Sequence, residues 1–149
     1  KRERSYPKDA LSFSLLILLN RITMKKQVNK IKADLQHFFG TEKVFKIPLI
    51  GTRFTDGLKY LANEAECFWL ITDASVIAKS LSNRSEFITI DFKRLSEKEQ
   101  FEKQCEAIIN YSDGKGTIFE THRYNVNDFP LDELRLLFVD NTLMLPSEY

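Results

Sequence analysis

The side chains that could carry out chemistry in this chain are few, and the first candidates are two aspartates. Asp56 and Asp73 lie on either side of the apolar run Phe68–Ile71, which is predicted to be a central strand. At one end of a sheet, two carboxylates a few to about ten ångströms apart could act as the acid and base of a hydrolase. Both residues also stand where a helix is expected to begin. Aspartate is favoured there, so capping is the expected role.

A pair of nucleophile and base is the second candidate. The histidines of the chain are His37 and His122, and its cysteines are Cys67 and Cys105. A histidine beside a cysteine could activate the thiolate. Both cysteines fall in predicted strands among apolar residues, where cysteine behaves as a small hydrophobic side chain. Structural roles are therefore expected for all four residues, and their spacing predicts no zinc site.

Motifs for phosphate, metal or acyl-transfer chemistry are absent from the sequence. Residues 112–116, Ser-Asp-Gly-Lys-Gly, contain a Gly-Lys pair but lack the strand–loop–helix setting of a phosphate-binding loop, so they predict a hairpin turn. The chain has no HExxH and no Gly-x-Ser-x-Gly sequence. We therefore expect no cofactor, no metal and no catalytic residue, and hence a protein that is not an enzyme.

Charge is distributed unevenly along the chain. Residues 1–39 contain nine Lys or Arg against three Asp or Glu, a net of +6, and because the whole chain carries +1 the remainder carries −5. A helix is expected in this region, and its basic face consists of Lys25, Lys26, Lys30 and Lys32. Such a face could bind an acidic protein or phosphates, or it could simply be solvated. Because no aromatic residues are interleaved with it, direct nucleic-acid binding is not favoured.

Length and composition indicate one globular domain preceded by an extension. A chain of 149 residues with 43% hydrophobic and 29% charged residues can bury its own core. We expect residues 24–149 to form a single α+β domain and residues 1–23 to be an N-terminal extension, helical or poorly ordered. The apolar run Leu11–Leu19 is too short to span a bilayer, and no cleavage site follows it. The sequence thus predicts a cytoplasmic protein with no membrane partner.

Apolar spacing predicts three helices. The first covers residues 24–39 and ends at Gly40, and an ordered extension would lengthen it from a cap near Asp9. Its apolar stripe consists of Val28, Ile31, Leu35 and Phe38. The second helix begins with Thr55 as its cap, and a short third helix is expected after Asp73. The buried side of the second helix would consist of Leu58, Leu61, Ala62 and Ala65.

Strand patterns dominate the second half of the chain. The expected strands cover residues 86–95, 105–111, 117–124, 133–139 and 142–145, with a further short strand near 44–47. Asp140 and Asn141 tolerate positive φ and would make the last hairpin turn. Residues 96–103 could hold a helical turn. Together these elements predict an α+β fold with about three helices packed on one face of a mainly antiparallel sheet of about five strands.

Several of these segments, in this order and spacing, resemble one known family. They are Asp34–Glu42, Phe54–Ala65, Cys67–Asp73, Phe87–Phe92, Asp113–Gly116 and Asn127–Tyr149. The chain is similar over residues 24–149 to the DUF6876-like proteins, which are small uncharacterised bacterial and phage proteins. The resemblance supplies no catalytic residues. The frequent occurrence of such proteins on phages and mobile elements implies an accessory or anti-defence role, such as inhibition of a CRISPR-type complex.

The leading hypothesis is a non-enzymatic interaction module that binds a protein or nucleoprotein partner through the basic face. Two alternatives remain open. One is a small hydrolase or transferase that uses Asp56, Asp73 or a Cys–His pair. The other is an oligomeric scaffold, such as a homodimer, assembled through the Leu-rich segment Leu11–Leu19.

Overall fold

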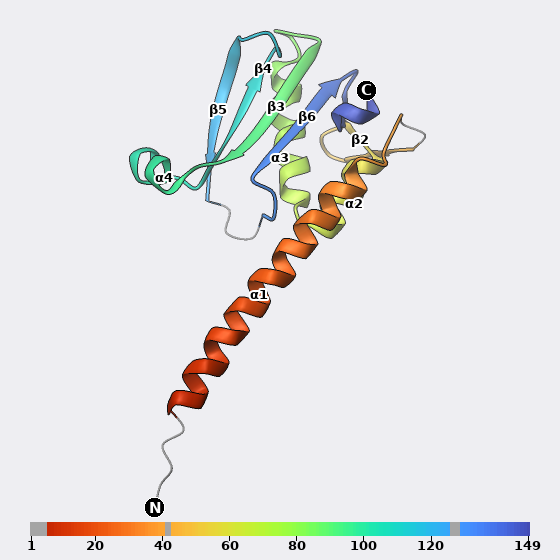
Figure 1. Cartoon of the computed structure of the whole chain (residues 1–149). Helices are drawn as coiled ribbons and strands as arrows, with labels where there is room; N and C mark the ends of the chain where they lie inside the picture. The colour runs from red at the N-terminus through yellow and green to blue at the C-terminus, as the bar shows by residue number, and fades with distance from the viewer. Residues whose placement is uncertain (1–5, 41–42, 126–128) are drawn as a thin grey trace, which may run out of the picture.

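The computed structural model of the chain describes residues 6–40, 43–125 and 129–149 (Figure 1). The first element, α1 (Tyr6–Leu35), is one continuous helix of 30 residues that crosses position 24 without a break. Proline is tolerated in its first turn, at Pro7, and no other Gly or Pro occurs before Gly40, which turns the chain with a φ of 65°. The expected cap at Asp9 is wrong, because the helix already begins at Tyr6. The expected turn at Asp128 lies outside the described residues.

Among the α1 side chains that the structure describes, those near its C-terminal end pack against the rest of the protein, and the other end of the helix points away from the sheet (Figure 1). Ile31 is fully buried, and Val28, Leu35 and Phe38 are partly buried against the same core. This confirms the predicted stripe. Tyr60, on the next helix, donates its hydroxyl hydrogen to Asp34 Oδ2 at 2.5 Å, and its ring lies 5.5 Å from that of Phe38. The stripe and this hydrogen bond attach α1 to the domain.

Helices α2 (Asp56–Glu64) and α3 (Phe68–Leu81) follow each other closely. The predicted start of α2 after Thr55 is confirmed, and Leu58, Leu61 and Ala62 are buried as expected. The predicted strand Phe68–Ile71 is wrong, because this run is the first turn of α3. A run of four apolar residues is too short for its period to separate strand from helix. The buried side of α3 shows helical spacing and consists of Leu70, Ile71, Ala74, Ser75, Ala78 and Leu81.

Three further predictions near α3 also need correction. Asp73 does not cap a helix but lies inside α3. Cys67 stands at the N-cap of α3, and Cys105 lies in the connection that follows α4 (Glu97–Lys103), so neither cysteine is in a strand. Both are nevertheless buried. Their burial was predictable from their apolar neighbours, whereas their secondary structure was not.

The described strands form one seven-stranded sheet in the order β1-β2-β7-β6-β3-β4-β5. The strands are β1 (Val44–Lys46), β2 (Arg53–Thr55), β3 (Phe87–Arg94), β4 (Ala107–Ser112), β5 (Ile118–Tyr124), β6 (Glu133–Val139) and β7 (Thr142–Met144). Only the pair β2 and β7 is parallel, and the other neighbours in the described sheet are antiparallel. The α+β class and the mainly antiparallel sheet are therefore confirmed.

The number of elements was underestimated. The described residues form four helices and seven strands, against about three and about five expected. Strands β1 and β2 have three residues each, too few to show a clear alternation. Helix α4 fills the charged link 97–103, where Ser96 accepts a hydrogen bond from the backbone of Glu99. Such short elements depend on neighbours for their stability, and a local pattern detects them poorly.

Both predicted hairpins are present. In the last one, Asp140 and Asn141 have φ values of 50° and 56° and form a two-residue turn of the type that matches strand twist. In the other, the carboxylate of Asp113 accepts hydrogen bonds from the backbone N–H groups of Lys115 at 2.7 Å and Thr117 at 3.1 Å. The segment 112–116 is therefore a turn, as expected.

The last residues of the chain return to the start of α2. The short 3₁₀ helix Pro146–Glu148 buries the Glu148 carboxylate, whose Oε1 accepts hydrogen bonds from Thr55 Oγ1 at 2.6 Å and Leu145 N at 3.2 Å. Its Oε2 accepts from Gly57 N at 3.2 Å. A Cβ at Gly57 would lie 2.5 Å from Glu148 Oε1 and 2.6 Å from Leu145 Cδ1. The position therefore requires glycine.

Substitutions in this contact should destabilise the fold. We expect Glu148→Ala to lower the free energy of unfolding by about 3 kcal/mol, because buried N–H and O–H groups lose a charged acceptor. Gly57→Ala should cost about 2 kcal/mol by overpacking. Urea unfolding followed by circular dichroism measures both. Ser147→Ala, an exposed neighbour, is the matched control and should change stability by less than about 0.5 kcal/mol. Equal stability of all three variants would contradict this account of the C-terminus.

Candidate functional site

The predicted basic face lies on the exposed surface of α1. Lys25, Lys26, Lys30 and Lys32 are all exposed, and in the described part of the chain none of them forms an ion pair. With about 100° between successive helical residues, Lys25 and Lys32 share one side, and Lys26 and Lys30 share a side about 130° away. The four lysines thus form two rows rather than a single line. Together they leave the docked side of α1, marked by Ile31, free of positive charge.

The same helix carries an apolar surface before the basic face. Leu15, Leu16, Ile17, Leu18, Leu19 and Ile22 are between 39% and 57% exposed. Figure 1 shows this end of α1 pointing away from the sheet. Apolar residues gathered on an exposed helix are typical of a contact surface. None of the described helices is long and apolar enough to cross a membrane.

An open cavity of about 800 Å³ lies where α1 leaves the domain. Met24, Gln27 and Val28 form its α1 wall, and Trp69 lies opposite. The ring of Trp69 packs against two other rings. Its centroid lies 5.5 Å from that of Tyr124 and 6.2 Å from that of Phe129. Arg94, also in the lining, is paired with Asp132 at 3.3 Å.

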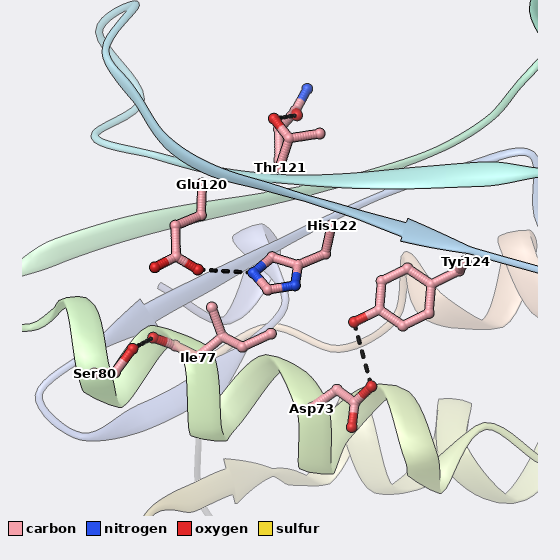
Figure 2. Close-up of polar contacts among 8 residues, drawn as sticks. Asp73, Ile77, Ser80, Glu120, Thr121, His122 and Tyr124 are labelled. Atoms are coloured by element: carbon pink, nitrogen blue, oxygen red, sulfur yellow. Dashed lines mark hydrogen bonds and ion pairs between the residues drawn. The ribbon is translucent and has the colours of Figure 1, made fainter. Parts of the chain in front are cut away.

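A second polar group lies between α3 and the edge strand β5 (Figure 2). Tyr124 donates its hydroxyl hydrogen to Asp73 Oδ2 at 3.2 Å, and His122 Nε2 lies 2.7 Å from Glu120 Oε2. The ring of Tyr111 is fully buried and meets the His122 ring edge-on, with centroids 5.5 Å apart. Because Glu120, His122 and Tyr124 alternate along β5, their side chains share the face of the sheet that α3 covers.

Burial dominates the electrostatics of this group. It is the main cause that raises the pKa of Tyr124 to about 12, and the nearby Asp73 carboxylate raises it further. The pKa of Tyr111 is also raised, first by burial and then by Tyr124 and Asp73. Both tyrosines therefore remain protonated at neutral pH, so that the Tyr124 hydroxyl is a hydrogen-bond donor to Asp73.

The remaining candidates from the sequence do not converge on one site. Burial raises the pKa of Cys67 to about 12, and its thiol contacts Leu61 O at 3.7 Å, so it is no thiolate nucleophile at neutral pH. His122 has Glu120 as its partner rather than a cysteine. Asp56 is exposed in the first turn of α2, and His37 is exposed after α1. The described residues include no group of three His, Cys, Asp or Glu that could hold a metal.

The sequence prediction missed Glu120, Tyr124 and Tyr111 as neighbours of His122 and Asp73. The alternation of residues 120, 122 and 124 in a predicted strand could have placed the first two beside His122. The contact with Asp73 could not be predicted from the sequence, because that residue was expected at the start of a helix. Only the packing of α3 on the sheet brings Asp73 to Tyr124.

Comparison with known protein families identifies a match that covers most of the chain. The model of a family described as a family of unknown function (DUF6876) matches residues 29–149. No curated protein and no solved structure matches the chain significantly.

The tyrosine environments predict how stability falls at high pH. The hydrogen bond to Asp34 is the main cause that raises the pKa of Tyr60 to about 12, and Tyr124 has a similar value, against 10.0 for an ordinary tyrosine. Because the folded-state pKa is the higher one, the contribution of these groups is fully present below pH 10 and is lost as the pH rises to about 12.

We expect the absorbance of tyrosinate at 295 nm to show at least two of the five tyrosines ionising near pH 12, together with loss of the circular dichroism signal. In urea, all five should ionise near pH 10. Complete ionisation below pH 11 with an intact fold would show that these hydrogen bonds do not form. The substitution Tyr124→Phe should lower by one the number of tyrosines that ionise near pH 12.

Proposed function

The chain belongs, over residues 29–149, to the DUF6876 family of proteins of unknown function, and on this premise we propose that it is a non-enzymatic binding module. Its contact surface is the basic face of α1, formed by Lys25, Lys26, Lys30 and Lys32. The partner is an acidic protein or a nucleoprotein. The observation that carries this proposal is that all four lysines are exposed on a helix that projects from the domain.

The surroundings of the basic face support a partner from outside the domain. Within the described residues, the lysines have no carboxylate partner, although the chain after residue 39 carries a net charge of −5. Exposed and unpaired lysines keep their full charge for a partner, and they raise the rate of encounter with an acidic surface. The rigid helix also holds them in a fixed arrangement, which lowers the entropy cost of binding.

The chemistry of the face favours contact with carboxylates or phosphates rather than bases. Lysine is a point charge, and no aromatic side chain alternates with these four on which a base could stack. A nucleic acid in a nucleoprotein would therefore be held by its backbone. The narrower hypothesis of an inhibitor of a CRISPR-type defence complex rests on the family resemblance alone, whereas its cytoplasmic location is an expectation from the sequence.

The alternative of a small hydrolase or transferase has less support. Both candidate nucleophiles, Cys67 and Cys105, are buried, and the Cys67 thiol is protonated at neutral pH. The carboxylate of Asp73 accepts a hydrogen bond from Tyr124. The His122–Glu120 pair is the group that this alternative retains, since both side chains are about 40% exposed. A His122→Asn variant with the full biological effect of the wild type would remove that pair as well.

Charge reversal tests the basic face. The double variants Lys26→Glu/Lys30→Glu and Lys25→Glu/Lys32→Glu each reverse one row. The double variant Lys98→Glu/Lys115→Glu changes the charge equally at exposed positions away from α1 and is the matched control. We expect each α1 variant to weaken partner binding about 10- to 100-fold, with a melting temperature unchanged, while the control binds like the wild type.

The partner is first identified by affinity purification of the tagged full chain, with and without nuclease, followed by mass spectrometry. Binding of the purified partner is then titrated at two salt concentrations. A partner lost with nuclease would indicate that nucleic acid forms the contact. Wild-type affinity in both α1 variants would rule out the basic face as the contact surface.

A further inference from the structure

An open hollow of about 640 Å³ lies on the sheet, at the end that carries the turn between β4 and β5. The side chain of Ile88 is buried in the core that the helices cover, so the next residue of β3, Thr89, points to the opposite face. Leu137 on β6 is in register with Thr89 and shares that face. Because β3 lies between β4 and β6, the turn at Gly114 borders the hollow on one side and Pro146 on the other.

The hydroxyl group of Thr89 is the unusual feature of this hollow. Thr89 lines the hollow and is only 2% exposed, yet among the described residues its Oγ1 has no hydrogen-bond partner. A hydroxyl removed from water without a partner costs free energy. The space beside it is open because Gly114 has no side chain, and a Cβ there would lie 2.8 Å from Thr89 Oγ1. This hydroxyl is therefore available to a ligand that enters the hollow.

Apolar side chains form the rest of the floor. Phe87 and Leu137 line the hollow on either side of Thr89. The ring of Tyr149, which is 75% exposed, meets the ring of Phe87 edge-on, with centroids 5.5 Å apart. Exposed aromatic and aliphatic surface of this kind suits a flat apolar ring. The volume of the hollow is in the range of sites for small molecules.

The charged groups in the lining favour an anion. They are Lys115, Arg135 and Asp113, with a net charge of +1. In the described part of the chain Lys115 forms no ion pair. Arg135 binds Asp91 through Nε at 2.7 Å and Nη2 at 3.2 Å, and its Nη1 donates to no described group. The carboxylate of Asp113 already accepts hydrogen bonds from backbone N–H groups of its own turn.

We propose that the hollow binds a small organic anion, namely a flat aromatic ring that carries a carboxylate. The ring packs on Phe87 and Leu137. The carboxylate accepts hydrogen bonds from the ammonium group of Lys115, from Nη1 of Arg135 and from the hydroxyl of Thr89. Such bonds to a charged acceptor are the strong ones in a site that is partly open to water.

This site is separate from the basic face. The hollow lies at the end of the sheet with the β4–β5 turn, whereas α1 projects beyond the other end (Figure 1). The inference therefore does not rest on the proposed function. Inorganic phosphate alone would leave Phe87 and Leu137 uncovered, so the ring and the anionic group are both required.

Titration of the full chain with a naphthalene carboxylate tests the site. In proton–nitrogen NMR spectra, the amide signals of Thr89, Gly114 and Leu137 should shift, with a dissociation constant of about 1 mM or less. The neutral naphthalene carboxamide has the same ring and shape without the charge. We expect it to bind at least about 10-fold more weakly.

Two variants separate binding from folding. Thr89→Val keeps the shape of the side chain and should weaken binding of the carboxylate about 5- to 10-fold, with a melting temperature equal to that of the wild type or higher, because the hydroxyl has no partner in the fold. Lys115→Gln should weaken binding about 5-fold. Lys98→Gln removes one positive charge from exposed α4 and is the matched control, which should bind like the wild type.

Four results would overturn the proposal. They are the absence of shifts at about 5 mM carboxylate, equal affinity for the carboxamide, wild-type affinity in both Thr89→Val and Lys115→Gln, and shifts confined to the exposed leucines of α1. A lower melting temperature of Thr89→Val would also contradict it, since the hydroxyl would then support the fold. None of these results bears on the charge-reversal test of the basic face.

Discussion

The buried carboxylate of Glu148 joins the C-terminal residues of the domain to the start of α2. It accepts hydrogen bonds from Thr55, Gly57 and Leu145, and so ties the last turn of the chain to the first turn of α2. A carboxylate at a helix N-terminus also interacts favourably with the helix dipole. The parallel pairing of β2 with β7 brings the same two segments together. The position of α2, and through Tyr60 that of α1, therefore depends on this contact.

Several polar side chains of the domain have partners within the protein, whereas those on the projecting half of α1 are exposed to solvent. In the domain, Glu148, Asp34 and Asp73 each have a hydrogen-bond donor, and Cys67 is buried as a neutral thiol. On α1, lysines and leucines are exposed. A rigid helix that is attached near one end by Val28 and Ile31 and is exposed over residues 14–27 is suited to contact with another molecule. This contrast places the candidate surfaces for a protein or nucleoprotein partner on α1.

Residues whose local pattern and packing agree were predicted well. The alternation of Ile88, Ile90 and Phe92, the Asp140-Asn141 turn and the Val28–Leu35 stripe all appear as expected, because each depends on a period or a turn that is local in sequence. The strand predicted for Phe68–Ile71 was wrong, because four successive apolar residues show no period that separates helix from strand. The basic face and its two rows follow from spacing in a helix, whereas the exposure of its lysines required the tertiary structure. The contact of Tyr124 with Asp73 could be predicted only if residues 68–81 were known to form a helix.

The sequence by itself determined the α+β class, both hairpins, the start of α2 at Thr55 and the basic character of the first 39 residues, since all of these follow from short-range periodicity, turn chemistry or composition. Only the tertiary structure decided that residues 6–35 form one helix, that its Leu-rich half is uncovered, and that Glu148 closes on Gly57. The closure of Glu148 on Gly57, and the fact that the core covers only the C-terminal half of α1, depend on contacts between residues far apart in the chain. Such contacts are set by packing, and no local pattern encodes which distant surface a residue will meet.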